Sequence, residues 1–397
     1  MKTALKELVT LRRGNSYQGA LVGEVGAPLL GLGTIAREGG FKGDKLRHYP
    51  EEFADRIAVS AGDVYVSLKD MTQEAALLGA AARVPDGLDR ARLTQDTIAV
   101  DILEDAPISR SFLYWTLRSP QCRAHCKSLG TGTTNLDLGR DDFLSYEFWL
   151  PSTKEQKLIA EVLGALDDKI VANRRVVDAG DALICALYSL TPKASAGRTF
   201  ADVADIGGGG TPSTKSPAYW DGDVAWATPT DVTAVDGPWL ARTTRSISEE
   251  GLKSCSSPLY PEGSILMTSR ATIGAVVVAR KPMAVNQGFI VLNAVESEMQ
   301  WWLESQVRAR TAEFETWANG ATFLEISRGT FKRLPVLECS PEDLERFNRT
   351  AQAVRERQSS CQAENDRLAR TRDELLPLLM NGRITVKDAE GAVGDVV

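Results

Sequence analysis

The sequence predicts an α+β protein with two α/β globular domains, each followed by a long helix, and with the two helices packed as an antiparallel coiled coil. Three observations lead to this fold class. The chain repeats itself once, each copy begins with short β-rich runs broken by glycine and proline, and each copy ends in a long stretch of 3.6-residue hydrophobic periodicity. The 397 residues suffice for roughly two to three domains, each with its own core.

The internal repeat can be followed along most of the chain. Matching pairs are Gly14 with Gly209, Lys69 with Arg270, Asp137 with Glu325, Arg140 with Arg328, Phe143 with Phe331 and Asn173 with Asn365. The spacing within the pairs drifts between 188 and 201 residues, which indicates loop insertions on a common scaffold. Two copies are too few for a solenoid, so we interpret each copy as a domain with its own helix.

Periodicity and composition divide the chain into five parts. In order, these are a globular domain over residues 1–150, a helical region over 151–195, a second domain over 196–338, a second helical region over 339–386 and a tail over 387–397. Within the domains, the β-rich runs are 63–68, 97–102, 263–267 and 275–279, and the helical stretches are 111–117 and 299–316. We expect the small, polar tail to be disordered.

Both helical regions have start and stop signals. Ser152 or Thr153 can cap the first helix, which Pro192 ends because proline cannot donate to the helical ladder. Pro341 suits the first turn of the second helix, and Asn381-Gly382 ends it. The apolar stripes are Ile159, Leu163, Leu166 and Ile170 on the first helix, and Phe347, Val354, Leu368 and Leu375 on the second.

The helices are far longer than their own domains require. At about 38 residues and 1.5 Å per residue, each spans on the order of 55 Å. The stripes must therefore pack on something else, and the economical solution is each other. An antiparallel pair would relate the two domains by an approximate two-fold axis.

The charge balance argues against binding of nucleic acid by bulk positive charge, because the chain has 46 basic and 53 acidic residues and a net charge of −7. A local patch can still bind. Basic residues do cluster, among them Lys42 with Lys45 and Arg242 with Arg245. Taken singly, each cluster is more often a solvated face.

The same composition predicts a cytoplasmic protein without a membrane partner. No apolar run approaches the roughly 20 residues that span a bilayer, and the charged start of the chain does not resemble a secretory signal. The six cysteines lack the spacing of a disulfide framework, so we expect reduced thiols.

Signals for catalysis or metal binding are weak. The glycines at 207–210 lack the lysine and helix of a phosphate-binding loop, which favours a flexible loop. Cys122, His125 and Cys126 resemble half a zinc site, yet no second ligand pair follows, and we expect no metal. The chain has two histidines, and it lacks the motifs of adenine methylation and of ATP-driven motors.

Lys69 and Arg270 are the strongest candidates for contact with a polyanion. Each lies seven residues after a glycine at the start of a strand, so the repeat places a cation at the same strand end in both copies. Such a cation can bind phosphate or guanine, although a pair of surface charges explains the pattern equally well. Thr228, Thr230 and Asp231 share a loop that can reach base edges, unless Asp231 holds that loop through backbone hydrogen bonds.

The second copy and the helix before it carry short motifs in a fixed order. They are Glu155-Gln156, Leu166-Asp167 and Asn173 on the helix, then Gly210-Thr211-Pro212-Ser213-Thr214, Tyr219-Trp220, Thr228-Pro229, Thr268-Ser269-Arg270 with Ile273-Gly274, and Asn286-Gln287-Gly288. This set resembles the central helix and the target recognition domain of type I restriction-modification specificity subunits. The resemblance covers nearly the whole chain, but the first domain has Gly14-Asn15-Ser16 in place of Gly210-Thr211-Pro212 and lacks the Tyr-Trp pair.

The resemblance implies a non-catalytic subunit that reads double-stranded DNA at an asymmetric two-part site, one half per target recognition domain. It also implies that two methyltransferase subunits and a restriction subunit assemble on the helices. S-adenosylmethionine and ATP would bind to those partners, with no cofactor in this chain. The expected DNA contacts are Lys42, Lys45, Lys69, Thr211, Ser213, Thr228, Thr230, Asp231, Arg242, Arg245 and Arg270. The expected partner-binding residues are Ile159, Leu163, Leu166, Ile170, Asn173, Phe347, Val354, Asn365, Leu368 and Leu375.

Other classes of protein remain open at this point. A coiled-coil scaffold without DNA would explain the helices and the acidity, but not two elaborate, divergent domains. A stand-alone enzyme would explain the domains, but lacks the motifs for its chemistry. Within the DNA-reading class, the specificity subunit of a related methylation-based phage-defence system is a further alternative. DNA binding measured with and without methyltransferase subunits separates the scaffold and the enzyme from the DNA-reading class.

Overall fold

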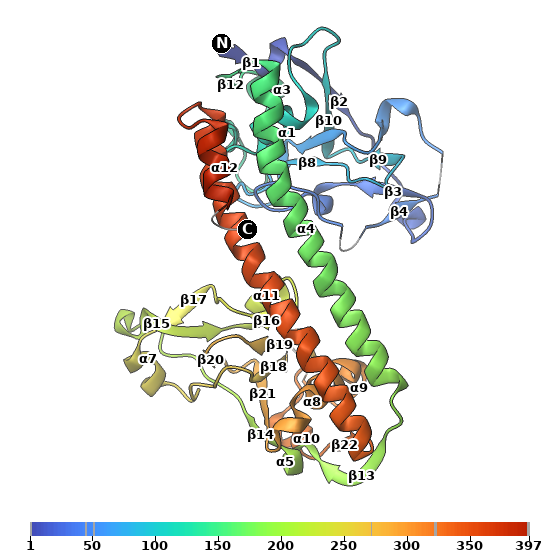
Figure 1. Cartoon of the computed structure of the whole chain (residues 1–397), viewed down its shortest axis with the longest axis vertical. Coiled ribbons are helices and arrows are strands. Elements are labelled where there is room, and N and C mark those ends of the chain that lie inside the picture. The colour runs from blue at the N-terminus through green and yellow to red at the C-terminus, as the bar shows by residue number, and fades with distance from the viewer. Residues whose placement is uncertain (1, 44–45, 51, 271, 321–323, 395–397) are drawn as a thin grey trace. The chain divides into compact units, whose positions relative to one another are not determined.

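The computed structural model describes residues 2–394 apart from 44–45, 51, 271 and 321–323 (Figure 1). The chain divides into two compact units. Unit 1 combines Met1–Asp168 with Arg367–Val397, and unit 2 comprises Lys169–Asp366. Each unit contains one globular domain, part of the long helix α4 (Thr153–Leu190) and part of the long helix α11 (Pro341–Met380).

Two four-stranded sheets form the centre of unit 1. One is antiparallel with the order β2–β10–β6–β8, and the other has the order β4–β3–β9–β5. Tyr65 and Leu93 are fully buried in the core that these sheets share. The strands are β1 (Lys2–Ala4), β2 (Val9–Arg13), β3 (Ala27–Leu30), β4 (His48–Tyr49), β5 (Ala58–Val59), β6 (Val64–Ser67), β7 (Lys69–Asp70), β8 (Ala81–Arg83), β9 (Ala91–Leu93), β10 (Thr97–Ile102), β11 (Leu136–Asp137) and β12 (Glu147–Trp149). The helices are α1 (Arg110–Arg118), α2 (Pro120–Leu129) and α3 (Arg140–Leu144).

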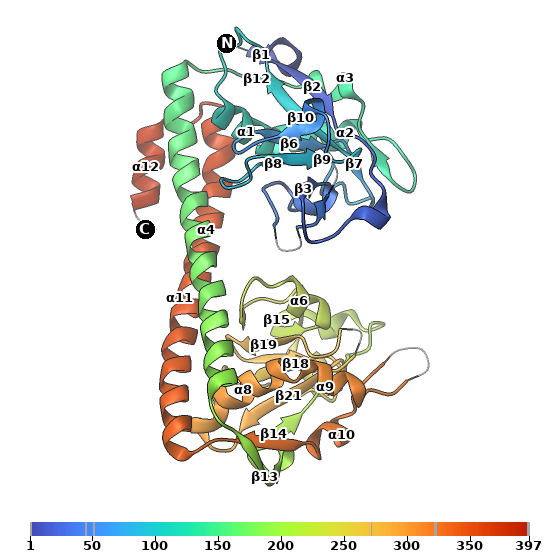
Figure 2. The same ribbon diagram turned by 90° about the vertical axis from the view of Figure 1, so that its right-hand side faces the viewer.

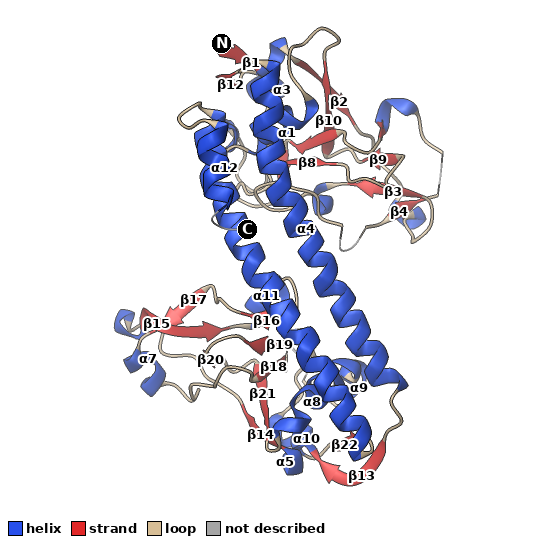
Figure 3. Ribbon diagram, viewed as in Figure 1, coloured by secondary structure: helices blue, strands red, loops and turns tan. Residues whose placement is uncertain are grey.

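Unit 2 contains a five-stranded sheet with the order β14–β21–β18–β19–β16 and a three-stranded sheet with the order β17–β15–β20 (Figure 3). Its strands are β13 (Ala194–Thr199), β14 (Ala204–Gly207), β15 (Trp220–Ala227), β16 (Trp239–Leu240), β17 (Arg245–Ile247), β18 (Ile265–Thr268), β19 (Val276–Ala279), β20 (Met283–Val285), β21 (Phe289–Ala294) and β22 (Pro335–Glu338). Its helices are α5 (Phe200–Val203), α6 (Pro229–Ala234), α7 (Glu249–Ser254), α8 (Gln300–Ala309), α9 (Thr311–Thr316) and α10 (Arg328–Lys332).

Helix α8 joins the five-stranded sheet of unit 2 to the long helices (Figure 2). Trp302 is fully buried, and its ring lies 4.8 Å from that of Tyr188 on α4 and 5.1 Å from that of Phe347 on α11. Its indole N–H donates to the Leu337 carbonyl at 2.8 Å, so the polar edge of the ring is satisfied inside the core.

The predicted repeat is confirmed in the backbone of the two units. In unit 1, Lys69 pairs with Asp137 between β7 and β11. In unit 2, Arg270 forms a bridge with Glu325. Two pairs of residues that match in the sequence therefore also pair in the same way in space, and the two domains share this part of their fold.

The long helices begin and end close to the predicted positions. The Glu155 carboxylate accepts from the Ser152 backbone N–H at 3.0 Å, which completes a capping box at the start of α4. Within unit 2, α4 and α11 are antiparallel, because Asn173 donates to Asn365 at 3.0 Å while Asp181, further along α4, pairs with Arg355. The approximate two-fold relation of the domains stays a prediction.

Three structural expectations need correction. The stretch 299–316 is two helices, because the backbone turns at Arg310 between α8 and α9. The expected disorder of 387–397 is wrong for most of the tail. Residues Val386–Gly394 form helix α12. At its start the Asp388 carboxylate accepts from the Thr385 backbone N–H, and Ala389 is fully buried. Residues 395–397 lie outside the described part of the chain.

The third correction concerns the apolar stripes of the long helices. Most of the residues expected to bind partner subunits are buried inside this chain, so they build its own core and are not available to another protein. Their exposed fractions are Ile159 3%, Leu163 0%, Leu166 1%, Ile170 5%, Asn173 2%, Phe347 4%, Leu368 0% and Leu375 7%. Val354 and Asn365 are half-buried.

Candidate functional site

A polar cleft of about 560 Å³ lies in unit 2, next to the strand end that carries Arg270. Four segments meet there: the end of β14 with the glycines after it, the residue after β18, the turn after β20, and the segment that leads into α10. The cleft is lined by Gly209, Ser269, Gln287, Phe289, Glu325, Ile326, Ser327, Arg328, Gly329 and Lys332.

The glycine-rich segment is packed against its neighbours, contrary to the expectation of a flexible loop. A Cβ on Gly209 would stand 1.8 Å from the Val285 carbonyl oxygen, which no side chain permits. Gly210 donates to that same carbonyl at 3.1 Å, and its own carbonyl accepts from the Trp226 indole at 3.1 Å. Glycine is therefore required here for close approach of two backbones.

The side chains of two arginines pack against glycines at this site. A Cβ on Gly208 would meet the Arg328 side chain at 3.0 Å, and a Cβ on Gly288 would stand 3.4 Å from Arg270 Nε. Arg270 is half-buried, whereas Arg328 and Lys332 are exposed. Within the described part of the chain, none of these three cations has an acidic partner within 4 Å, so their charge is available to a ligand.

Thr211 is bonded to Gln287, which lines the cleft. The Thr211 hydroxyl donates to Gln287 Oε1 at 2.6 Å, which directs the amide N–H groups of Gln287 away from this bond. Ser213, also a predicted contact, is exposed two residues further on, where its carbonyl accepts from the Trp220 indole at 3.2 Å. Both hydroxyl side chains therefore stand on a segment that tryptophans hold in place.

Asp231 holds its loop together, as the alternative interpretation of the sequence allowed. Its side chain is 6% exposed, and its two oxygens accept from the backbone N–H and the hydroxyl of both Thr228 and Thr244 at 2.6 to 2.8 Å. Burial raises the pKa of this carboxyl, but the hydrogen bonds from Thr228 and Thr244 outweigh it and lower the pKa. These bonds support the interpretation in which Asp231 holds the loop, while Thr230 is exposed.

Lys69 has a different environment from its repeat counterpart Arg270. Lys69 Nζ lies 3.6 Å from a carboxylate oxygen of Asp137 and 3.9 Å from one of Asp96. In unit 1 the cation is therefore neutralised by its own chain. Lys42 is exposed in the same unit, and Lys45 lies outside the described residues.

The other two predicted cations of unit 2 make contacts inside the chain. Arg242 pairs with Asp366 on α11 at 3.1 Å. The Arg245 guanidinium lies 3.5 Å from the centre of the Trp220 ring, a cation–π contact. The structure therefore does not bring Arg242 or Arg245 into the cleft.

Cys122, His125 and Cys126, whose spacing resembles half a zinc site, all lie on helix α2. Cys122 and Cys126 are both fully buried there, and the His125 ring nitrogen contacts the Asp142 carbonyl at 2.9 Å. Among the residues that the structure describes, no three histidine, cysteine or acidic side chains gather as a metal site would require. Nor does any described helix combine the length and apolarity needed to cross a membrane.

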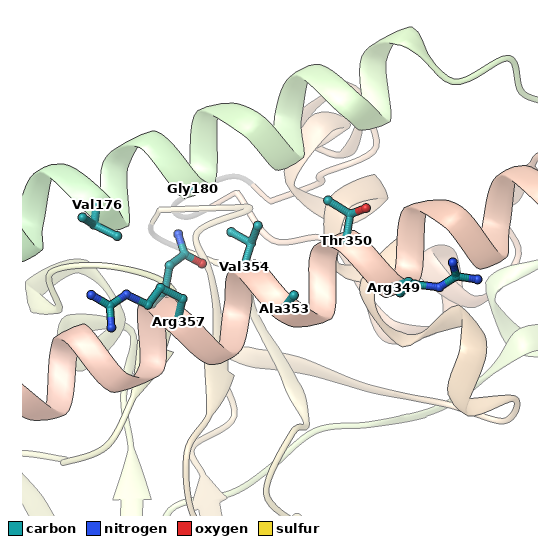
Figure 4. A pocket seen from close by; sticks show the side chains of 8 residues that line it. Val176, Gly180, Arg349, Thr350, Ala353, Val354 and Arg357 are labelled. Atoms are coloured by element: carbon teal, nitrogen blue, oxygen red, sulfur yellow. The ribbon is translucent and has the colours of Figure 1, made fainter.

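A second hollow of about 520 Å³ runs between α4 and α11 within unit 2 (Figure 4). Gly180 permits the close approach of the helices, because a Cβ there would stand 2.8 Å from Gln358 Nε2. Val176 and Leu183, seven residues apart on α4, are 39% and 46% exposed beside it. The groove is lined by Val176, Gly180, Arg349, Thr350, Ala353, Val354, Arg357 and Gln358.

The sequence did not single out Arg328, Gln287 or Glu325 as members of a site. The available signals were indirect. Arg328 and Glu325 match Arg140 and Asp137 in the repeat, and Gln287 lies in a short motif of polar and glycine residues. Residues from segments up to about 120 positions apart converge here, and their proximity follows from the sheet order rather than from local patterns.

Comparison with known proteins agrees with the sequence motifs. Residues 192–336 match the type I restriction modification DNA specificity domain. A segment of 149 residues is 36% identical to the type I restriction enzyme MjaIX specificity subunit of Methanocaldococcus jannaschii, covering 37% of this chain and 34% of that protein. A segment of 190 residues is 28% identical to the HindI specificity subunit of Haemophilus influenzae, covering 47% of this chain and 41% of that protein.

These matches span well under two thirds of either curated relative. The fold agrees over a greater length. The S subunit of a type I restriction-modification system from M. genitalium aligns with 96% of both chains at a TM-score of 0.59, with 14% sequence identity. Residues 192–336 are therefore similar to a type I restriction modification DNA specificity domain, and the chain shares the fold of a solved S subunit.

Proposed function

We propose that this chain is the DNA-reading subunit of a type I restriction-modification complex and recognises an asymmetric, two-part site in double-stranded DNA. The observation that carries the proposal is the cleft of unit 2, which lies within the matched domain. It is lined by Arg328 and Lys332 and lies beside Arg270, and none of these three cations has an acidic partner among the described residues. Free cations bind backbone phosphates, and arginine also reads guanine. The repeat supplies a second, divergent domain for the other half of the site.

The groove between α4 and α11 supports a scaffolding role. Exposed apolar side chains at Val176 and Leu183 flank it, and apolar surface of this kind is typical of a protein interface. We propose that two methyltransferase subunits and a restriction subunit assemble on the helices through such exposed positions, in place of the buried stripe. The compartment that follows from a role on chromosomal DNA is the cytoplasm.

We further propose that the chain has no catalytic role and no cofactor of its own. Its sequence lacks the methylation and nucleotide-binding motifs, so S-adenosylmethionine and ATP belong to the partner subunits. In this division of labour, the chain chooses the site and its partners carry out the chemistry.

The test is DNA binding and adenine methylation by the chain together with its partner methyltransferase. Arg270→Ala and Arg328→Ala are each expected to weaken binding by roughly 1 to 3 kcal/mol, and to lower the salt slope by about one where the contact is to phosphate. Arg333→Ala is the matched control, because Arg333 is exposed next to Lys332 but does not line the cleft.

Two outcomes would contradict the proposal. A complex that binds no DNA at any salt concentration would leave a coiled-coil scaffold as the better description. Methyl transfer by this polypeptide alone, with S-adenosylmethionine added, would make it an enzyme. Equal binding by the two cleft variants, the control and the unmodified chain would remove the cleft from the interface.

A further inference from the structure

Glu325 places a carboxylate in a cleft that is otherwise suited to phosphate. It lines the cleft with Arg328 and Lys332, and its backbone forms bridges with Arg270 and Asn319. The side chain is exposed, and no hydrogen bond or ion pair to its carboxylate occurs within the described part of the chain. An unpaired carboxylate repels phosphate and lowers affinity for any DNA, so its presence at this point calls for a compensating interaction.

The repeat provides an internal comparison. Asp137 occupies the same place in unit 1, paired through its backbone with Lys69. There the carboxylate lies 3.6 Å from Lys69 Nζ, so its charge is balanced within the chain. Glu325 is longer by one methylene group, and its neighbour Arg270 extends across Gly288. The acid of unit 2 is therefore free to interact with a ligand, whereas the acid of unit 1 is already paired.

The ligand groups that suit this carboxylate are limited. An ionised carboxylate is an acceptor without a proton to donate. In the major groove, guanine and thymine present acceptor oxygens, and guanine also its N7, while cytosine N4 and adenine N6 are exocyclic amino groups that donate. Glu325 would therefore be repelled by an acceptor edge and attracted by an amino group.

The neighbours of Glu325 supply the complementary donors. Arg328 carries N–H groups within the same cleft, and Gln287 has its Oε1 engaged by Thr211, which leaves its amide N–H groups to face a ligand. Donors beside one acceptor match a base pair, which presents an amino group on one base and acceptor atoms on the other. A phosphate group would accept from the donors Arg328 and Gln287, but its negative charge would repel the Glu325 carboxylate.

We propose that Glu325 is a specificity-determining residue that accepts a hydrogen bond from the exocyclic amino group of cytosine or adenine in the half-site read by the second domain. The inference rests on the proposed DNA-reading function. According to this inference, Glu325 lowers the affinity for DNA of any sequence and raises the preference for one base over the others. Asp137 has no such role, because its charge is balanced by Lys69.

The experiment uses the full chain in complex with its methyltransferase. The methylated site is first mapped by sequencing, and each base pair in both half-sites is then replaced in a set of duplexes. Dissociation constants are measured for the cognate duplex, the single replacements and an unrelated duplex. The variants are Glu325→Ala, Asp137→Ala and, as a matched control, Glu262→Ala, where Glu262 is an exposed acid of unit 2 that does not line the cleft.

The expected result has two opposite parts. At one position, the unmodified complex prefers cytosine or adenine on a given strand to guanine or thymine on that strand by about tenfold or more. Glu325→Ala, which removes the acceptor as well as the charge, reduces that preference to less than about threefold, and at the same time tightens binding to the unrelated duplex severalfold, because a repulsive charge is gone. A merely structural residue would weaken both. Asp137→Ala and Glu262→Ala keep the preference at this position.

Three results would overturn the inference. At the affected position, a base analogue that lacks the exocyclic amino group could bind as tightly as the natural base, or Glu325→Ala could leave the preference at every position unchanged. The same variant could also weaken cognate and unrelated DNA alike, with the thermal unfolding midpoint lowered, which would make Glu325 structural. In all three cases DNA binding by the complex still stands. Failure of the unmodified complex to bind DNA is a distinct outcome, because it removes the proposed function itself.

Discussion

The positions of individual residues at the cleft depend on neighbouring glycines, which leave room for them, more than on any ligand-binding motif. Gly208 and Gly288 lie beneath Arg328 and Arg270, and Gly209 lets its backbone approach that of Val285. The flexible-loop interpretation of this segment was wrong because a run of glycines can serve close packing as well as flexibility. Asp231 illustrates the opposite case, since a polar loop residue proved to be buried and fully hydrogen-bonded.

Replacing Gly209 tests this close approach. Gly209→Ala places a Cβ 1.8 Å from the Val285 carbonyl oxygen, so the segment after β14 must move away from β20. We expect unfolding free energy to fall by about 1 to 3 kcal/mol, with loss of DNA binding through the cleft. Gly164→Ala is the control, because nothing lies within 4 Å of a Cβ there and alanine favours the helix by roughly 0.5 to 1 kcal/mol. Chemical denaturation measures both, and equal effects would refute the packing argument.

At the scale of elements, each domain is attached to the long helices by a buried ionic cluster. In unit 1, Asp167 on α4 accepts from Arg118 on α1 at 2.7 Å and pairs with Arg372 on α11. In unit 2 the helix of the domain supplies an acid in place of an arginine. Arg355 on α11, 1% exposed, donates to both Glu304 oxygens on α8 at 2.9 Å and pairs with Asp181 on α4. Helix α1 therefore contributes the cation to its ion pair with the long helices, whereas α8 contributes the anion.

The cluster of unit 2 predicts a specific dependence of stability on pH. Burial raises the pKa of Glu304, but attraction to Arg308 and Arg355 outweighs burial and lowers the pKa below its ordinary 4.5. A carboxyl with a lowered pKa in the folded state contributes stability that is present above its unfolded value and is lost as the pH falls through the folded value. Acid should therefore weaken this attachment.

Glu304→Gln is the variant for that prediction. It leaves the buried Arg355 without its main counter-charge, and we expect a loss of roughly 3 to 5 kcal/mol in unfolding free energy at pH 7. The loss should shrink as the pH approaches 3. Urea denaturation at pH 7, 4.5 and 3 measures it, with Glu345→Gln on exposed α11 surface as the control. A loss that is independent of pH would contradict the assignment.

The whole molecule is a repeat in which each unit combines one domain with parts of the same two helices. Helices α4 and α11 have 38 and 40 residues, and Asn173 and Asn365, which match in the repeat, bond to each other. We expect such a helix pair to set the distance between two half-sites, about one DNA turn or 34 Å from centre to centre. The two domains differ in sequence, so the site should be asymmetric.

Lengthening the helices tests this. Four residues inserted after Asn173, with four more next to Asn365, should move the domains apart by about 6 Å, roughly two base-pair steps. The recognised bases should stay the same while the spacer between them lengthens. Sequencing of methylated adenines reads the spacer directly, and a four-residue insertion at the exposed turn before Gly87 should leave it unchanged. The old spacer with full activity in the helix variant would show that the helices do not set the distance.

The sequence by itself determined the repeat, the two long helices and the main strands. These features follow from local rules: hydrophobic period, capping residues and the effects of proline and glycine on the backbone. Helix α4 runs over Thr153–Leu190 and β10 over Thr97–Ile102, close to the predicted bounds. The motifs of the second copy also indicated the type I restriction modification DNA specificity domain that residues 192–336 match.

Tertiary structure alone decided which polar residues are free. Lys69 and Arg270 are equivalent in sequence, yet Lys69 is paired with Asp137 while Arg270 has no acidic partner within 4 Å among the described residues. The stripe on α4 was visible and α11 was its expected partner, but the contact of α4 with α8 was not expected, because a periodic pattern specifies that a face is buried and not everything that buries it. Charge balance and burial depend on residues brought together from distant positions in the chain, and these distances exist only in the folded protein.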